Sequence, residues 1–366
     1  MSIRNLSLLV GSPVPVPVDV DVSDALERVE VETAIGERGT FRLTFDLDGR
    51  PHLPERFLLN TGDLLRVVLV LKEAGVSSVV MDGVMVVHTL ITANTRKPSL
   101  VISGADLTLL MDQIEFVRSF AGMPLQTRVT VLLSAYGVLG VVPVVITPPL
   151  AQIPLSAERI PNQNTTDYAY IRELAASVGF RFTLDPGPTP GSSLAYWGPE
   201  PRADRSRPGL VIDVARLSGI DSLQLRFDAN HRVAPQALVL DPSSKSVISI
   251  PAPDITTLVR PLGDVVPPAH QHRLLRDTAK MTQLDAAGAL LAVGARTAEA
   301  MSGEGSLDVD RTHVSLRAGA IVDVRGAATP FDGLYEVRRV HHTLTSRTHT
   351  QTFELLRAGI GGEAQP

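Results

Sequence analysis

Alternating apolar and polar residues dominate the first third of the chain. Between Thr40 and Leu47 every second residue is apolar, and residues 25–33 alternate in a similar way. A two-residue period is typical of strands with one buried face. Similar patterns predict further strands at residues 64–71, 79–90 and 100–103. Residues 20–105 are therefore predicted to form a small antiparallel barrel or a sandwich.

A helical period follows. Asp106 is an expected N-cap and Pro124 stands where a first-turn proline would, so a helical segment is predicted at about residues 106–137. No residue between Arg128 and Glu158 is charged, a length that would suit a membrane span. Repeated Gly and Pro interrupt this stretch, and a helix in lipid could not satisfy the freed backbone groups. We predict a buried helix and an apolar strand there, without membrane insertion.

The second half is predicted to hold four features. An amphipathic helix starting at Thr165 or Thr166, followed by a hairpin, occupies residues 165–198. The proline-rich residues 251–268 are typical of an extended arm. Residues 282–301, rich in Ala and Leu, predict the longest helix, and residues 308–357 predict a last group of strands.

These elements predict a mainly β protein with some α structure, of the α+β class. We divide it into an N-terminal domain at residues 1–157 and a second domain at 158–366, either of which can be assembled from discontinuous segments. The residues show no fixed-period repeat. Only a loose duplication of character is visible, with strands and helices in both halves.

Composition excludes several functional classes. A hydrophobic content of 44% and a charged content of 20% are ordinary for a globular protein. A net charge of -5 gives no electrostatic reason to expect nucleic-acid binding, and the absence of cysteine excludes disulfides. The N-terminal residues lack the apolar core of a signal peptide, so none is expected.

Candidate chemistry is weak throughout. Leu59–Gly62 resembles the Asp-Thr-Gly loop of aspartic proteases, but position 60 is Asn, which cannot share a proton with a second carboxylate. We interpret the histidines at 270, 272, 341, 342 and 349 as exposed or interface residues, because no metal-binding signature accompanies them. The sequence predicts no catalytic, cofactor-binding or metal-ligating residue and no enzyme.

Three other segments were weighed for a binding role. Arg202–Pro208 is either an anion or partner site or a solvated connector, and the connector is favoured. Gly303–Ser306 is interpreted as the cap and turn after the long helix. Asp308 and Asp310, with Glu304 nearby, miss the calcium-loop spacing and are interpreted as a solvated turn.

Three motifs, in order, resemble the family of baseplate hubs that includes late control protein D and VgrG. The first combines Val29–Val31 with Phe41–Phe45 and Met81–Val84. The second is the helix in Asn164–Phe182, followed by Ser193–Pro199. The third is Phe331–His342 with Thr350–Arg357. The matches span nearly the whole chain, and hubs of extracellular contractile injection systems and of contractile phages both fit.

The resemblance implies two tail-tube-like antiparallel β-barrel domains with helical and hairpin insertions. It implies a homotrimeric hub that joins a sixfold inner tube to a threefold spike within a phage tail-like particle. Such a particle is assembled in the bacterial cytoplasm and in some systems released. VgrG itself carries a spike domain for which this sequence has no room, so a separate spike protein is expected. A particle-associated hydrolase and a β-rich binding module are the alternatives.

Overall fold

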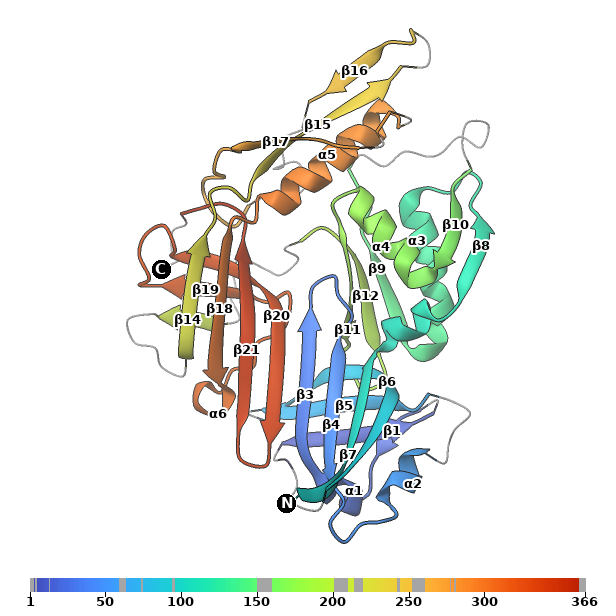
Figure 1. Cartoon of the computed structure of the whole chain (residues 1–366), viewed down its shortest axis with the longest axis vertical. Coiled ribbons are helices and arrows are strands. Elements are labelled where there is room, and N and C mark those ends of the chain that lie inside the picture. Colours follow the sequence, from blue (N-terminus) through green and yellow to red (C-terminus); the bar gives the residue numbers. More distant parts are fainter. Residues whose placement is uncertain are drawn as a thin grey trace.

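The computed structural model is elongated and consists mainly of antiparallel strands (Figure 1). The elements form four groups, which we call the first unit, the insertion unit, the second unit and the arm. The residues that the structure describes are 3, 5–12, 14–58, 64–73, 75–93, 96–149, 160–200, 210–213, 220–241, 244–251, 261–276, 278–279 and 281–361.

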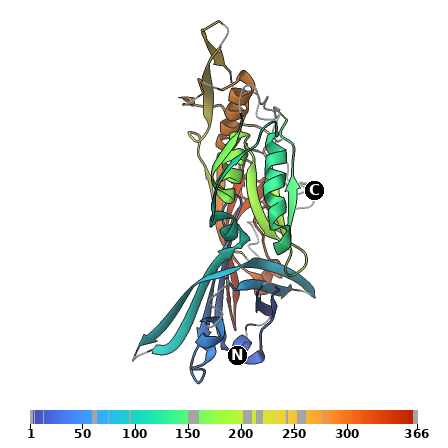
Figure 2. The same ribbon diagram turned by 90° about the vertical axis from the view of Figure 1, so that its right-hand side faces the viewer.

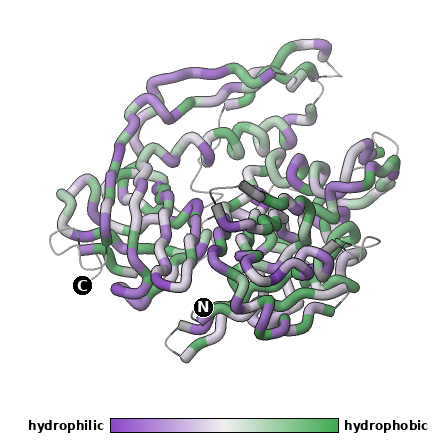
Figure 3. Tube along the Cα trace, turned by 60° about the horizontal axis from the view of Figure 1, so that its bottom comes forward, coloured by the Kyte–Doolittle hydropathy of each residue, from purple (hydrophilic) through white to green (hydrophobic). Residues whose placement is uncertain are grey.

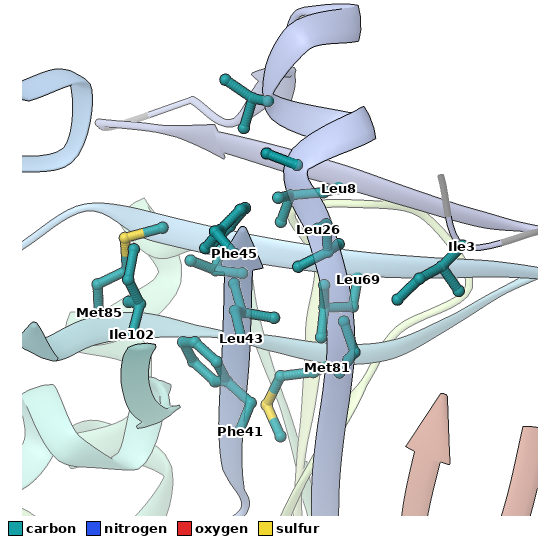
Figure 4. Packing of buried hydrophobic residues seen from close by; sticks show 14 of the residues in the cluster. Ile3, Leu8, Leu26, Phe41, Leu43, Phe45, Leu69, Met81, Met85 and Ile102 are labelled. Carbon is teal, nitrogen blue, oxygen red and sulfur yellow. The ribbon is translucent and has the colours of Figure 1, made fainter. Parts of the chain in front are cut away.

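The first unit is a strongly curved sheet closed over an apolar core. Its elements are β1 Leu6–Gly11, β2 Val16–Pro17, α1 Val20–Ala25, β3 Leu26–Ala34, β4 Thr40–Asp46, α2 Leu53–Leu58, β5 Arg66–Glu73, β6 Val76–Ala93 and β7 Arg96–Asp106. They hydrogen-bond in the order β3-β4-β7-β6-β5-β1-β2. The alternation in β4 turns Phe41, Leu43 and Phe45 inward (Figure 4). The predicted strands of this region are confirmed.

The insertion unit follows β7 and has its own core around Trp197. Its elements are η1 Leu107–Asp112, β8 Glu115–Ser119, α3 Leu125–Ser134, η2 Ala135–Leu139, β9 Val141–Val145, β10 Asn162–Thr166, α4 Asp167–Ser177, β11 Arg181–Pro186 and β12 Ser193–Gly198. Thr166 caps α4 as predicted, and β11 and β12 form the predicted hairpin. The predicted boundary at residue 157 lies outside the described residues. Strands before and after it pair, β8 with β10 and β9 with β12.

The second unit closes the chain. Its elements are β13 Leu210–Asp213, β14 Ile220–Phe227, β18 Met301–Asp308, α6 Val309–Thr312, β19 Ile321–Arg325, β20 Gly333–Thr345 and β21 His349–Arg357. They pair in the order β14-β18-β21-β20-β19-β13. Its core includes Tyr335, Val337, Val340, Phe353 and Leu355, and Figure 3 shows hydrophobic and hydrophilic residues mixed along the chain.

The arm is inserted between β14 and β18. It comprises β15 Val233–Leu240, β16 Val247–Ile250, β17 Gln271–Leu274 and α5 Gln283–Thr297, and it projects from one end of the molecule (Figure 1). Residues 252–260 of the proline-rich stretch lie outside the described residues. The described remainder includes Val265, which forms a β-bridge to Ile360 of the second unit.

The two barrel units repeat one strand order. β3, β4, β5, β6 and β7 correspond to β14, β18, β19, β20 and β21, and a short helix follows the second strand of each series. Bulges recur at equivalent places: between Leu26 and Arg28 in β3 as between Ile220 and Ser222 in β14. A second pair of bulges lies in β6 after Met85 and in β20 after Val337. Because bulges are specific local features, this agreement marks an internal duplication.

The predicted long helix is confirmed as α5, although it ends at Thr297 rather than at residue 301. The interpretation of Gly303 was wrong, because this residue is part of β18 and not a turn after a helix. A Cβ on Gly303 would approach the Leu225 side chain to 2.8 Å, and one on Gly305 would approach Phe353 to 2.5 Å. The glycines thus make room for side chains of neighbouring strands.

Two further predictions needed correction. Within the predicted strand group at 308–357, residues 314–316 are not a strand, because the Gln351 side chain hydrogen-bonds the backbone of Leu316 in place of a strand partner. The segment predicted to be helical at 106–137 consists of η1, α3 and the start of η2, and β8 separates η1 from α3. None of the helices in the described part of the chain is long and apolar enough to span a membrane.

Candidate assembly surfaces

The two barrel units are joined edge to edge within the chain. β20 changes partner along its length: residues 333–336 pair with β19, and residues 339–345 pair with β3 of the first unit. In this seam His342 lies opposite Val31 and Leu344 opposite Val29. A single sheet therefore runs from the second unit into the first, and the edge of β3 is hidden from solvent pairing.

Charged residues line the outer face of the seam. Arg339 of β20 forms ion pairs with Glu32 of β3 and with Glu37, at 2.7 Å for Glu37, and also reaches Glu354 at 3.2 Å. His341 lies 3.6 Å from Glu32. These side chains are partly exposed, so each pair contributes little to stability. Their arrangement instead favours one register of β20 against β3.

A buried ion pair holds the insertion unit against the first unit. Arg66 of β5 binds Asp82 of β6 through two bonds of 2.7 Å. The same guanidinium donates to the Gly191 carbonyl at 3.0 Å, and the Ser193 hydroxyl donates to Asp82 at 3.3 Å. The β11–β12 hairpin is thus fixed to the sheet by a network whose charged side chains are 9% and 0% exposed.

Asp106 organises the start of the insertion unit. Its carboxylate accepts from the backbone N–H of Gly39 at 2.5 Å and from that of Thr108 at 2.9 Å. Burial raises the pKa of Asp106 to about 6, although these hydrogen bonds and nearby Arg38 act in the opposite direction. The predicted capping role is confirmed, with η1 in place of an α-helix.

The structure changes the interpretation of two histidines. His342 and His349 were predicted to be exposed or at an interface, but both are buried, with ring centroids 5.5 Å apart. Burial lowers the pKa of His342 to about 3, with the charges of His349, His341 and Arg317 acting in the same direction. Burial also lowers the pKa of His349 to about 4, against Asp310 and Asp308. Both rings are neutral at pH 7.

This pair predicts a loss of stability in weak acid. Both folded pKa values lie below the unfolded value of about 6.5, so the unfolded chain binds more protons in between. Stability is therefore full above about pH 6.5 and falls as the pH drops toward the folded values. We expect the histidines to cost about 3 kcal/mol between pH 6.5 and 5.

The measurement is urea unfolding at both pH values for the natural chain and for the double variant His342→Gln/His349→Gln. Other groups that titrate in this range, such as Asp106, affect both chains equally. The difference between the two chains isolates the histidines. An identical pH dependence in both would contradict the prediction.

The other candidate residues do not form a site. His270 and His272 are exposed, and Asp308 caps α6 by accepting from the Asp310 N–H at 2.9 Å. No group of three His, Asp or Glu that could hold a metal ion occurs in the described ranges. The candidate segments 59–62 and 202–208 lie outside the described residues.

Two of the open strand edges belong to long strands of the barrel units, β14 and β6. β14 pairs with β18 on one side, and no described strand pairs with its other side. β6 pairs with β5 through residue 84, while residues 87–93 have only β7 as a partner among the described strands. Figure 2 shows the β6–β7 hairpin reaching away from the body of the molecule. The alternation of residues 79–90 predicts the strand β6 but not its open edge, which depends on the whole sheet order.

These features define a class: a protein with two equivalent barrel units, a continuous sheet and open edges suited to assembly. The fold is similar to that of a tail protein from Neisseria meningitidis, at 15% identity and a TM-score of 0.62, over 96% of this chain and 97% of that one. It is similar to a 43 kDa tail protein of a Shewanella oneidensis prophage, at 11% identity and 0.58, over 96% and 98%.

A third similar structure is the PdpA–VgrG complex of Francisella, at 12% identity and a TM-score of 0.59, over 97% of this chain and 58% of that one. No family model and no curated protein matches the sequence. The resemblance to baseplate hub proteins and the mainly β class are therefore confirmed at the level of the fold.

Proposed function

We propose that this chain is the structural hub of a contractile, phage tail-like baseplate. In that role it forms a homotrimer that joins a sixfold inner tube to a threefold spike. The fold shared with tail proteins and with the VgrG complex supports the role. The partners proposed are the tube protein, a spike protein and other baseplate components, in a particle assembled in the bacterial cytoplasm and released in some systems.

One observation carries the proposal: the duplicated strand order with its matching bulges. A chain with two equivalent units presents six such units when three copies close a ring. One face of this ring can then meet a sixfold partner while the chains themselves keep threefold symmetry. The continuous sheet from β20 to β3 makes the two units one rigid body that transmits force without catalysis.

The oligomeric state tests this function. Light scattering of the purified chain, with and without its tube and spike partners, is expected to give a mass three times the 39.2 kDa of one chain. Electron microscopy of the complex is expected to show six similar lobes around a channel. A monomer at all concentrations, also with both partners present, would contradict the proposal.

One depression has residue types that bear on the hydrolase alternative. It has a volume of about 460 Å³ and contains Asp310, Ser346 and His349. The Nε2 atom of His349 lies 3.2 Å from Nδ1 of His342, and the Asp310 carboxylate accepts from the His349 backbone N–H. Because these contacts orient the imidazole toward another histidine, the arrangement does not match a nucleophile–base–acid relay. The structural role is favoured.

A further inference from the structure

We propose that β14 of one copy pairs with residues 87–93 of β6 in a second copy, in the register that β3 and β20 have within one chain. This inference rests on the proposed ring and names the surface that closes it. The partner is thus another copy of the same chain, joined head to tail.

The internal duplication identifies the two edges as a matched pair. β14 is the equivalent of β3, and β6 is the equivalent of β20, in the strand order and in the bulges. Within the chain, β3 lies against the part of β20 that extends beyond β19. β6 likewise extends beyond β5, and that part has no second neighbour among the described strands. The equivalents of the two paired edges in the seam are therefore β14 and residues 87–93 of β6, and both lack a partner strand among the described residues.

The side chains at the two edges fit burial better than exposure. Leu90 on β6 is 58% exposed and Phe227 on β14 is 38% exposed, and Val86 and Val87 are exposed too. The Nε2 atom of His88 is buried without a hydrogen-bond partner in the described part of the chain. Long, apolar open edges promote indiscriminate pairing, so a defined partner strand is the expected way to cover them.

The duplication also fixes the register. Val87 follows the bulge in β6 as Arg339 follows the bulge in β20, so Leu90 is the counterpart of His342. Leu225 is the counterpart of Val31. Leu225 lies opposite Gly303 of β18, Val31 lies opposite Phe41 of β4, and Gly303 and Phe41 are at equivalent positions. His342 faces Val31 inside the chain, and Leu90 is therefore placed opposite Leu225. By the same count His88 lies opposite Phe227.

A head-to-tail pairing of this kind has consequences for assembly. One copy contributes β14 and the next contributes β6, so the interface is heterologous and each copy has one open edge of each kind. Such contacts give a ring when the rotation between copies closes. At three copies the sheet would run without a break through six barrel units, with β3–β20 and β14–β6 seams in alternation.

Disulfide trapping tests the register, and the natural chain helps because it contains no cysteine. Leu90→Cys and Leu225→Cys are made in separate chains, mixed and oxidised. Residues directly opposite on antiparallel strands have Cα atoms about 4.5–5.5 Å apart, which a disulfide can bridge. The matched control is Thr89→Cys mixed with Leu225→Cys, because Thr89 points to the other sheet face. Each variant oxidised alone controls for pairing of like residues.

The expected result is a covalent dimer of the Leu90 and Leu225 variants, at several times the yield of the Thr89 control. A trimer by light scattering without this crosslink would leave the proposed function standing and overturn the pairing. A crosslink that forms in open-ended oligomers, or in rings that do not contain three copies, would support the pairing and contradict the trimeric hub. A monomer without crosslink would contradict both.

A second variant measures the interface without oxidation. Leu90→Glu places a charge in the proposed seam and is expected to weaken association at least about tenfold, because an unpaired charge would be buried there. Val76→Glu is the control on the same strand: Val76 is 67% exposed and lies at the turn next to β5, away from the open edge. Equal association of the two variants would overturn the proposal.

Discussion

Replacing Arg66 with methionine is expected to lower the free energy of unfolding by about 3–5 kcal/mol. The substitution leaves the Asp82 carboxylate, with a fully buried side chain, without its cation. It also removes the hydrogen bond to the Gly191 carbonyl that fixes the hairpin of the insertion unit. An isolated buried carboxylate is either kept charged at a large desolvation cost or protonated, and both destabilise the folded state.

Urea unfolding at pH 7 measures the effect. The double variant Arg66→Met/Asp82→Leu is expected to recover much of the loss, because it removes both charges together. Arg28→Met is the surface control: Arg28 binds Glu30 at 2.8 Å, but its side chain is 49% exposed, so less than about 1 kcal/mol is expected. A loss of stability for Arg66→Met as small as that for Arg28→Met would show that the buried network does not hold the insertion unit against the first unit.

The sequence predicts the strands in which large apolar and polar residues alternate without a break. β4 alternates large apolar residues with polar ones, and that pattern alone determines which face is buried. β18 has the sequence MSGEGSLD, with two glycines where large residues would be expected. Those glycines are explained by Leu225 and Phe353 on neighbouring strands. That information belongs to the tertiary structure and is absent from the segment itself.

The residues show only a loose duplication, for a related reason. Phe41 and Gly303 occupy equivalent positions in β4 and β18, and Leu100 and Gln351 do so in β7 and β21. The side chains that fill the interior differ between the two barrel units, so the amino-acid sequence does not repeat. The pairing of the backbone strands does repeat. Strand order and bulges are set by hydrogen bonding across the sheet, which no local sequence pattern records.

The buried histidines could have been predicted in part. A two-residue period places Gln351, Phe353 and Leu355 on one face of the last strand, and all three are buried. His349 is in phase with them, so the same alternation predicts its burial. The pairing of β20 with β21 then brings His342 opposite Gln351. Histidine is intermediate in its preference for burial, so the residue type alone does not predict these positions.

Replacing Trp197 with alanine is the second change with a large expected effect, a loss of about 3–5 kcal/mol. The indole is fully buried in the core of the insertion unit, with Phe180 edge-on at 4.9 Å between ring centroids. Its N–H donates to the Ile171 carbonyl at 3.2 Å and so ties β12 to α4. Alanine would leave a cavity among side chains that belong to both elements, which rigid neighbouring strands cannot fill.

Unfolding is followed by circular dichroism, because Trp197 is the sole tryptophan of the chain and its fluorescence is lost with it. Trp197→Phe keeps most of the apolar volume and loses the hydrogen bond, so a smaller loss is expected than for alanine. Val138→Ala, at a highly exposed position of η2, should have almost no effect. Hydrogen exchange is expected to show lost protection in α4 and β12 before the barrel units. If Trp197→Ala were as stable as Val138→Ala, the insertion unit would owe its structure to its contacts with the barrels rather than to this core.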